Sequence, residues 1–272
     1  MNKKDYGTLK KWFLKYTDSF LLEPKADREN ILLKKEHTLR VCSNMALICT
    51  DLPENDQSVA LTTALLHDVG RFEQLKRYGT FSDIKSEDHA SLGVRIIKEL
   101  GILHFLDPID ADLIVTAVEN HNKAVIDKRL SDRAMHICKL LRDADKLDIW
   151  HVVIGYYMEG LEKENPTIVH NLPAGEDVSI AIYDEFKKRN IIPFSMLETV
   201  IDFKILQMGW IFDINTNKAM ALAVERGCLE AIYKTLPHSE RIENLYQMMN
   251  KYLSANMHSD SALTNTIQSA MN

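Results

Sequence analysis

Two side chains that commonly bind metals stand next to each other in this chain, at the end of an apolar helical run. They are His67 and Asp68. Leu61, Leu65 and Asp68 follow the i, i+4, i+7 spacing that places them on one inward face of a helix. We expect Gly70 to end that helix, because glycine readily adopts a left-handed backbone. A buried imidazole and carboxylate need partners, and a divalent metal satisfies both groups. For the dipeptide alone, an exposed helix end is the alternative.

Four further helices are each predicted to carry one imidazole or carboxylate on an apolar face. These side chains are His37, in a stripe from Ile31 to Ile48; His89, in a helix that we expect Ser86 to cap; His121, in a helix that begins after Pro108; and Asp145, in a helix capped by Ser131. Taken singly, such a histidine is more often a core residue than a ligand.

Helix geometry separates the carboxylates of the last of these helices. At about 100° per residue, Asp145 lies about 40° from Leu141, whereas Asp143 lies some 200° away from Asp145. We therefore expect Asp145 to face the core and Asp143 to face outward or to support a ligand. Asp148 remains a competitor for the same role.

Taken together, four histidines and two aspartates on inward faces indicate a metal site. Neutral imidazoles combined with carboxylates suit Fe, Mn or Zn. Six ligands are too many for one metal with an open position, and they suit two metals about 3.5–4 Å apart that share a carboxylate and a hydroxide. We expect two divalent transition metal ions bound by His37, His67, Asp68, His89, His121 and Asp145.

The stretch from Arg71 to Lys85 has no clean periodicity and is rich in cations and aromatic rings. A loop that starts at the metal residues is well placed to cover the site and bind an anion, but for this stretch taken by itself a solvated connector is the favoured interpretation. Arg71 and Lys146 are the best candidates for neutralising charge in a transition state. For Arg77 and Lys85, a solvated surface position is the better interpretation.

The residues His37, His67-Asp68 and Ala144-Asp145-Lys146-Leu147 resemble those of the HD-domain metal-dependent phosphohydrolases, over about residues 30 to 150. The resemblance implies an all-helical bundle in which these residues bind one metal. Members with two further histidines, in the positions of His89 and His121, typically hold two metals bridged by the aspartate of the pair, here Asp68. The chain lacks the Gly-Tyr-Pro signature of the cyclic-dinucleotide subgroup, so that substrate is not carried over.

The function predicted from these residues is hydrolysis of a small phosphoester, with a nucleotide favoured, by a metal-bridging hydroxide. Asp68, Arg71 and Lys146 are the predicted catalytic residues. Phe72, Tyr78 and Phe81 are candidates for stacking on a base, although we expect a core position for at least one of them. One alternative is an HD-type diiron oxygenase that acts on a small polar substrate with the same ligands. Another is a regulatory or scaffold module, which the intact ligand set disfavours.

Composition sets the remaining expectations. An apolar content of 46% and a charged content of 26% describe a globular protein, and the net charge of −6 argues against a nucleic-acid polymer as partner. The four cysteines lack CxxC spacing, which predicts reduced core thiols. Without an apolar leader or a membrane-length run, we expect a cytoplasmic protein with no membrane partner. Whether it forms a homo-oligomer is left open.

Helical patterns dominate the whole chain, so the predicted fold is all-α. We expect an HD core over residues 25–152, a C-terminal helical annex over 153–254 packed on that core, and a disordered tail over 255–272. Within the annex, Ser195 to Glu198 matches a capping box that opens a helix through Trp210. A second helix is expected from Lys218 to Lys234, and a last one after Ser239.

Overall fold

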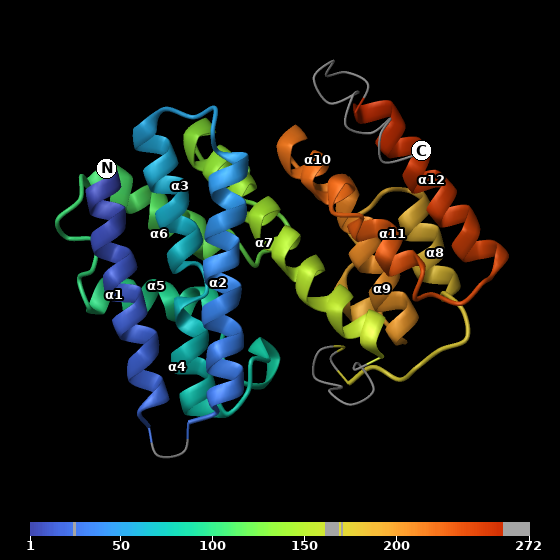
Figure 1. Ribbon diagram of the computed structural model, residues 1–272, viewed down its shortest axis with the longest axis horizontal. Coiled ribbons are helices and arrows are strands. Elements are labelled where there is room, and N and C mark those ends of the chain that lie inside the picture. Colours follow the sequence, from blue (N-terminus) through green and yellow to red (C-terminus); the bar gives the residue numbers. More distant parts are fainter. Residues whose placement is uncertain (24–25, 161–168, 170, 258–272) are drawn as a thin grey trace. The chain divides into compact units, whose positions relative to one another are not determined.

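The computed structural model describes residues 1–23, 26–160, 169 and 171–257. Every regular element within these ranges is an α-helix or a short 3-10 helix, so the all-α prediction is confirmed (Figure 1). The chain divides into two units, Met1–Asp148 and Ile149–Asn272. Within the described ranges, no helix combines the length and the apolar character that a membrane crossing needs.

The first unit is a bundle built around one central helix. Its elements are α1 (Lys3–Leu21), α2 (Arg28–Ile48), α3 (Glu54–Leu66), α4 (Val69–Tyr78), η1 (Asp83–Lys85), α5 (His89–Glu99), α6 (Pro108–Asn120) and the first part of α7 (Asp132–Glu159). Helix α3 contacts α1, α2 and α6 (Figure 1). Its sequence suits that position, because small side chains such as Ala60, Thr63 and Ala64 are buried on several of its faces.

Helix α1 was not predicted from the sequence, although it belongs to the first unit. Its buried residues form one stripe with spacings of four, four and three residues: Leu9, Phe13, Thr17 and Phe20. Phe13 and Phe20 pack against the ring of Phe72, with ring centroids 6.0 and 5.9 Å apart. Phe72 is therefore a core residue and not a stacking surface for a substrate.

The junction between α3 and α4 differs from the prediction. Gly70 does not end a helix; α3 ends at Leu66, and Gly70 lies in the first turn of α4. A Cβ atom at Gly70 would lie 2.2 Å from the carbonyl oxygen of His89 and 2.7 Å from the backbone nitrogen of Gly93. Glycine is required here because the backbones of α4 and α5 touch.

The predicted loop from Arg71 to Lys85 is helical through Tyr78, so that prediction was wrong for its first half. The helix buries Val69, Phe72 and Leu75 at a spacing of three, a pattern that is too short to stand out among the charged residues. Gly79, with a φ of 63°, ends it.

Two predictions for α5 and α7 also need correction. The N-cap of α5 is Asp88, whose side chain accepts a hydrogen bond from the Ser91 amide at 2.8 Å, and not Ser86. Asp143 is fully buried, so the prediction that it faces outward is wrong. Helix α7 buries Leu140, Leu141 and Ala144 around the same turn, so several faces are covered and one angle cannot identify the inner one.

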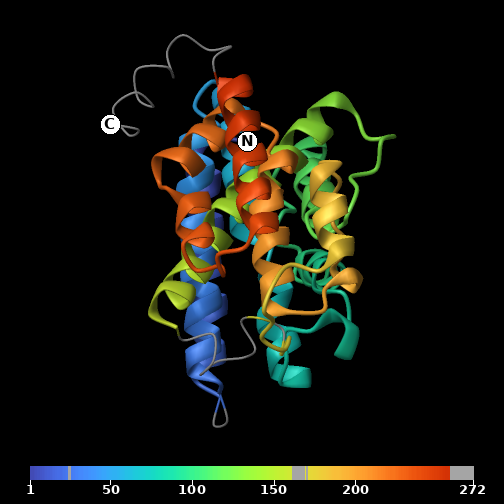
Figure 2. The same ribbon diagram turned by 90° about the vertical axis from the view of Figure 1, so that its right-hand side faces the viewer.

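The second unit is built around α9. Its elements after α7 are α8 (Ile180–Lys187), η3 (Phe194–Met196), α9 (Val200–Gly209), η4 (Trp210–Asp213), α10 (Asn217–Glu225), α11 (Cys228–Tyr233) and α12 (Glu240–Met257). Helix α9 contacts α8, η4 and α11, and α8 also contacts α12 (Figure 2). All residues of α9 from Ile201 to Met208 are buried, which explains why it forms the core.

Several helix boundaries in this unit differ from the predicted ones. The capping box is formed by Thr199 and Asp202, four residues later than expected. Gly227, with a φ of 62°, splits the single helix predicted from Lys218 to Lys234 into α10 and α11. The predicted tail begins inside α12, and its residues from 258 onward lie outside the described ranges. The domain boundary at 152 and the packing of the annex on the core stay predictions.

The four cysteines are free and buried, as predicted: Cys42, Cys49, Cys138 and Cys228. Burial raises the pKa of the Cys42 thiol to about 12 and that of the Cys138 and Cys228 thiols to about 11. These three thiols are therefore protonated at neutral pH.

Candidate metal centre

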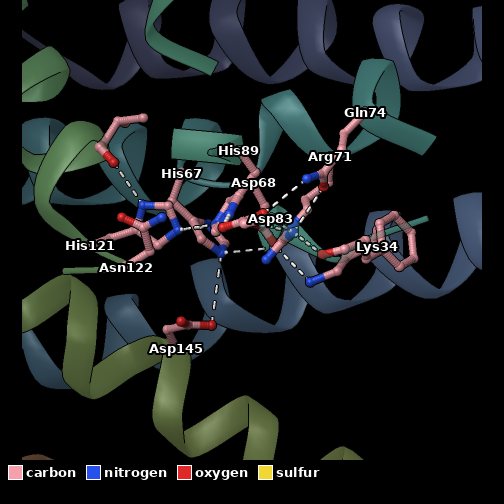
Figure 3. A network of polar contacts seen from close by, with 12 residues as sticks. Lys34, His67, Asp68, Arg71, Gln74, Asp83, His89, His121, Asn122 and Asp145 are labelled. Carbon is pink, nitrogen blue, oxygen red and sulfur yellow. Dashed lines mark hydrogen bonds and ion pairs between the residues drawn. The ribbon is translucent and has the colours of Figure 1, made fainter. Parts of the chain in front are cut away.

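The six predicted ligands come together in the first unit from different helices. α2 supplies His37, the α3–α4 junction supplies His67 and Asp68, α5 begins with His89, α6 is followed by His121, and α7 supplies Asp145. Figure 3 shows the imidazoles of His67 and His121 gathered beside Asp68, with Asp145 reaching toward them from α7. The Asp145 side chain is 20% exposed, compared with 1% for His67.

The two oxygens of Asp68 face two different pairs of imidazoles. Its Oδ2 atom lies 3.5 Å from Nε2 of His37 and 3.6 Å from Nε2 of His67. Its Oδ1 atom lies 3.4 Å from Nε2 of His89 and 3.8 Å from Nε2 of His121. One oxygen for each pair is the arrangement that a carboxylate bridging two metals requires.

Backbone carbonyls orient two of the four rings. The Nδ1 atom of His67 lies 2.8 Å from the carbonyl oxygen of Ala64, and the Nδ1 atom of His121 lies 2.7 Å from that of Val118. A carbonyl oxygen only accepts hydrogen bonds, so each Nδ1 carries the proton and each Nε2 presents its lone pair to the centre.

Carboxylates orient the other two rings. The Nδ1 atom of His37 lies 2.6 Å from Oδ2 of Asp148, and the Nδ1 atom of His89 lies 2.6 Å from Oδ2 of Asp83. Asp148 is thus a partner of His37 and not a competitor of Asp145. The Oδ1 atom of Asp145 lies on the other side of the His37 ring, 3.2 Å from Nε2. Carboxylate–histidine pairs of this kind are typical supports of metal ligands.

The donor atoms fit a divalent transition metal. Nε2 of His89 and Nε2 of His121 lie 3.0 Å apart, and when both rings carry their proton on Nδ1, two lone pairs face each other. Nε2 of His67 and Oδ1 of Asp145 are buried and have no hydrogen-bond partner among the described residues. A cation beside each of these two pairs of atoms would satisfy all four of them.

Electrostatics keeps three of the ligands in the forms that bind metals. Burial lowers the pKa of His67, and burial with the neighbouring rings lowers the pKa of His121 to about 3, so both rings stay neutral. Burial alone would raise the pKa of Asp68, but the positive charges of Lys34 and Arg71 outweigh it and hold the pKa well below its usual value. Asp68 is therefore ionised. For His37, burial and Lys34 lower the pKa, but Asp145 and Asp148 outweigh them and raise it.

Lys34 is a site residue that the sequence reasoning missed. Its ammonium lies 2.7 Å from Oδ2 of Asp68 (Figure 3). The signal that could have found it is its position one helical turn before His37, since residues three apart share a helix face.

A polar network on the other side of Asp68 was also missed. Asp83 contacts both His89 and Arg71. Its Oδ1 atom accepts a hydrogen bond from Nη1 of Arg71 at 2.9 Å. Gln74 is fully buried and donates to Asp83 Oδ1, at 2.9 Å, and to Ser86. The network fixes the segment between α4 and α5, so this segment is held by the site and is not a free connector.

The predicted cations have different surroundings. Arg71 reaches the centre, with Nε 3.5 Å from Oδ1 of Asp68. Arg77 pairs with Glu73 at 2.6 Å, and Lys85 is exposed, so both are surface cations as the better interpretation had it. Lys146 is buried on α7 beside Asp145, and its role in a transition state stays a prediction.

The sequence profile of the HD domain matches residues 35–151, the segment that contains all six predicted ligands. This segment is an HD domain. HD domains are generally metal-dependent phosphohydrolases, so the HD segment carries the features of a divalent-metal enzyme family. The match begins one residue after Lys34.

Three bacterial proteins match part of the chain. They are the bifunctional uridylyltransferase/uridylyl-removing enzymes of Bordetella pertussis, Bordetella parapertussis and Bordetella bronchiseptica, each 35% identical over 103 residues. The similarity covers 36% of this chain and 12% of each relative. No solved structure matches the chain significantly.

Proposed function

We propose that this protein is a binuclear metal-dependent phosphohydrolase that cleaves a small phosphoester, with a nucleotide as the favoured substrate. The observation that carries the proposal is the position of Asp68, which offers one oxygen to His37 and His67 and the other to His89 and His121. The HD family supports metal-dependent hydrolysis as the general chemistry.

The donors divide into two sets. His37, His67, Asp145 and Oδ2 of Asp68 would hold one ion, and His89, His121 and Oδ1 of Asp68 would hold the other. When bound, two divalent cations lower the pKa of a coordinated water and polarise phosphoryl oxygens.

Other residues of the chain position these groups and bind charge. Asp148 and Asp83 hold the rings of His37 and His89 through their Nδ1 atoms, so that each Nε2 keeps its direction. The guanidinium of Arg71 lies beside Asp68 and is fixed by Asp83, which suits it to bind a phosphoryl oxygen next to the metals. The partly exposed Asp145 marks a side from which a substrate can reach the buried histidines.

The names of the Bordetella relatives favour hydrolysis over oxygen chemistry. They include the removal of a uridylyl group, and a uridylyl group is a nucleotide attached through a phosphoester. This supports a phosphorylated nucleotide as substrate more than the small polar substrate of a diiron oxygenase.

A substrate screen on defined metal forms tests the proposal. Metal-stripped protein would be reloaded with Mn²⁺ or Fe²⁺ and assayed against phosphorylated metabolites, mononucleotides, dinucleotides and long single-stranded RNA. We expect release of phosphate or nucleotide from a small substrate, at equal rates with and without O₂. Strict dependence on O₂ would establish the oxygenase instead, and faster cleavage of the RNA than of every small substrate would contradict the substrate class.

A further inference from the structure

Lys34 and Arg71 approach the same carboxylate from two different helices. Nζ of Lys34 lies 2.7 Å from Oδ2 of Asp68, and Nε of Arg71 lies 3.5 Å from Oδ1. Figure 3 shows both cations on the side of Asp68 opposite to His121. A cation is therefore present next to each oxygen of the central carboxylate.

One aromatic ring supports both cations. Nζ of Lys34 lies 5.7 Å from the ring centroid of Phe81, and Cζ of Arg71 lies 6.0 Å from it. The carbonyl oxygen of Phe81 also accepts a hydrogen bond from Nη1 of Arg71. Cation–π contact with a shared ring holds the two charged groups close together without neutralising either of them.

Both groups have donors left for a ligand. An ammonium has three N–H donors, and among the described residues the Lys34 ammonium donates to Asp68 alone. Nε of Arg71 is buried and makes no hydrogen bond to the described residues. The Lys34 side chain is 21% exposed, so a ligand can reach it from solvent.

We propose that Lys34 is a substrate-binding residue that forms, with Arg71, a two-cation clamp for the oxygens of the phosphoryl group being cleaved. The inference rests on the proposed function, because that group must lie beside Asp68. Charge-assisted hydrogen bonds from two fixed cations match the two outer oxygens of a phosphoryl group. The aromatic ring of Phe81 has a role here in holding the cations, which differs from stacking on a base.

The neighbouring residue Lys35 provides the matched control. It has the same charge, lies on the same helix and is similarly exposed, at 18%, but its ammonium pairs at 2.5 Å with Asp18, which is 56% exposed. Lys35 therefore represents a surface ion pair, which contributes little to binding at the centre.

Binding of inorganic phosphate to the Mn²⁺-loaded full chain tests the clamp by titration calorimetry, with the metal content of each variant checked by elemental analysis. We expect K34Q to weaken phosphate binding about tenfold or more, K34R to stay within a few-fold of the wild type, and K35Q to leave it unchanged. These results with full metal content would support the clamp.

Three results would overturn it. They are no phosphate binding by the wild type, equal binding by K34Q and wild type, or loss of metal from K34Q at saturating Mn²⁺, which would mean that Lys34 acts only by supporting Asp68. The proposed function fails separately, when the wild type hydrolyses none of the screened phosphoesters. Hydrolysis with phosphate binding that does not depend on Lys34 would retain the function and reject the clamp.

Discussion

Asp68 in the first unit and Asp202 in the second are both buried carboxylates at the start of a helix, and they differ in what surrounds them. Oδ1 of Asp202 accepts from the Ser179 amide at 2.8 Å, and Oδ2 accepts from the amides of Glu198 and Thr199 at 3.2 Å each. Asp68 instead faces imidazole nitrogens and two cations. A carboxylate surrounded by backbone N–H groups stabilises a fold, whereas one surrounded by nitrogen lone pairs is a candidate metal ligand.

The largest effect that separates the two carboxylates is expected from Asp68→Ala. It should remove both metals and lower hydrolysis at least about a thousandfold, because in the proposed centre this carboxylate would serve both ions and each metal would contribute several kcal/mol to catalysis. Elemental analysis and the phosphoester assay measure this. An Asp68→Ala protein that retains two metals per chain would show that the carboxylate does not bridge.

A smaller loss is expected on one side of the centre. His121→Ala should reduce the metal content from two ions to one per chain, since the proposed division of donors places His121 with His89 and Oδ1 of Asp68. Elemental analysis of reconstituted protein gives the count. One metal in the wild type, with no change in His121→Ala, would contradict a binuclear centre.

The two aspartates of α7 should also separate. Asp145→Ala should abolish metal binding by His37 and His67, while Asp143→Ala should spare the metals and, because Asp143 is fully buried, lower thermal stability. Metal analysis and thermal unfolding distinguish the two outcomes. If Asp143→Ala lost the metal and Asp145→Ala kept it, the ligand assignment on α7 would be reversed.

The contact between α4 and α5 should be sensitive to one methyl group. Gly70→Ala should cost about 1–3 kcal/mol of folding stability and weaken metal binding, because the added Cβ would meet the backbone of His89. Gly155→Ala is the control, since a Cβ there meets nothing within 4 Å and should stabilise α7 by about 1 kcal/mol. Denaturant unfolding measures both. Equal stability of the two variants would show that α4 and α5 can move apart freely.

Asp202→Ala completes the comparison with an effect on stability alone. Removing its carboxylate leaves three backbone amides without their acceptor and should cost about 2–4 kcal/mol, while the metal content stays unchanged. Thermal unfolding and elemental analysis are again the measurements. Metal loss in this variant would show that the carboxylate of the second unit affects the centre after all.

The sequence was sufficient for the all-α class and for bringing the histidine and aspartate residues to one hypothesis, because each lies on or beside an apolar helical stripe. It was not sufficient for Lys34, since a lysine on a partly polar helix face looks like a surface residue until Asp68 is placed opposite. It also missed Asp83 and Gln74, whose partners His89 and Arg71 come close only after α4 and α5 pack.

Local sequence patterns gave wrong helix assignments where tertiary contacts determine the backbone conformation. Gly70 was assigned to a helix end because glycine often ends helices, but its role depends on the distance to Gly93, which no local pattern contains. The buried stripe of α1 is regular. Its helix was nevertheless not predicted, because one member of the stripe is the polar residue Thr17 and because Lys15, Asp18 and Ser19 lie beside it in the sequence.

The burial of the four cysteines has a consequence for handling and for measurement. Buried thiols react slowly with alkylating reagents and oxidants, so their modification requires local opening of the chain. Cys42, Cys49 and Cys138 belong to the first unit and Cys228 to the second. The labelling rate of each thiol, determined by mass spectrometry, therefore measures how often its own unit opens.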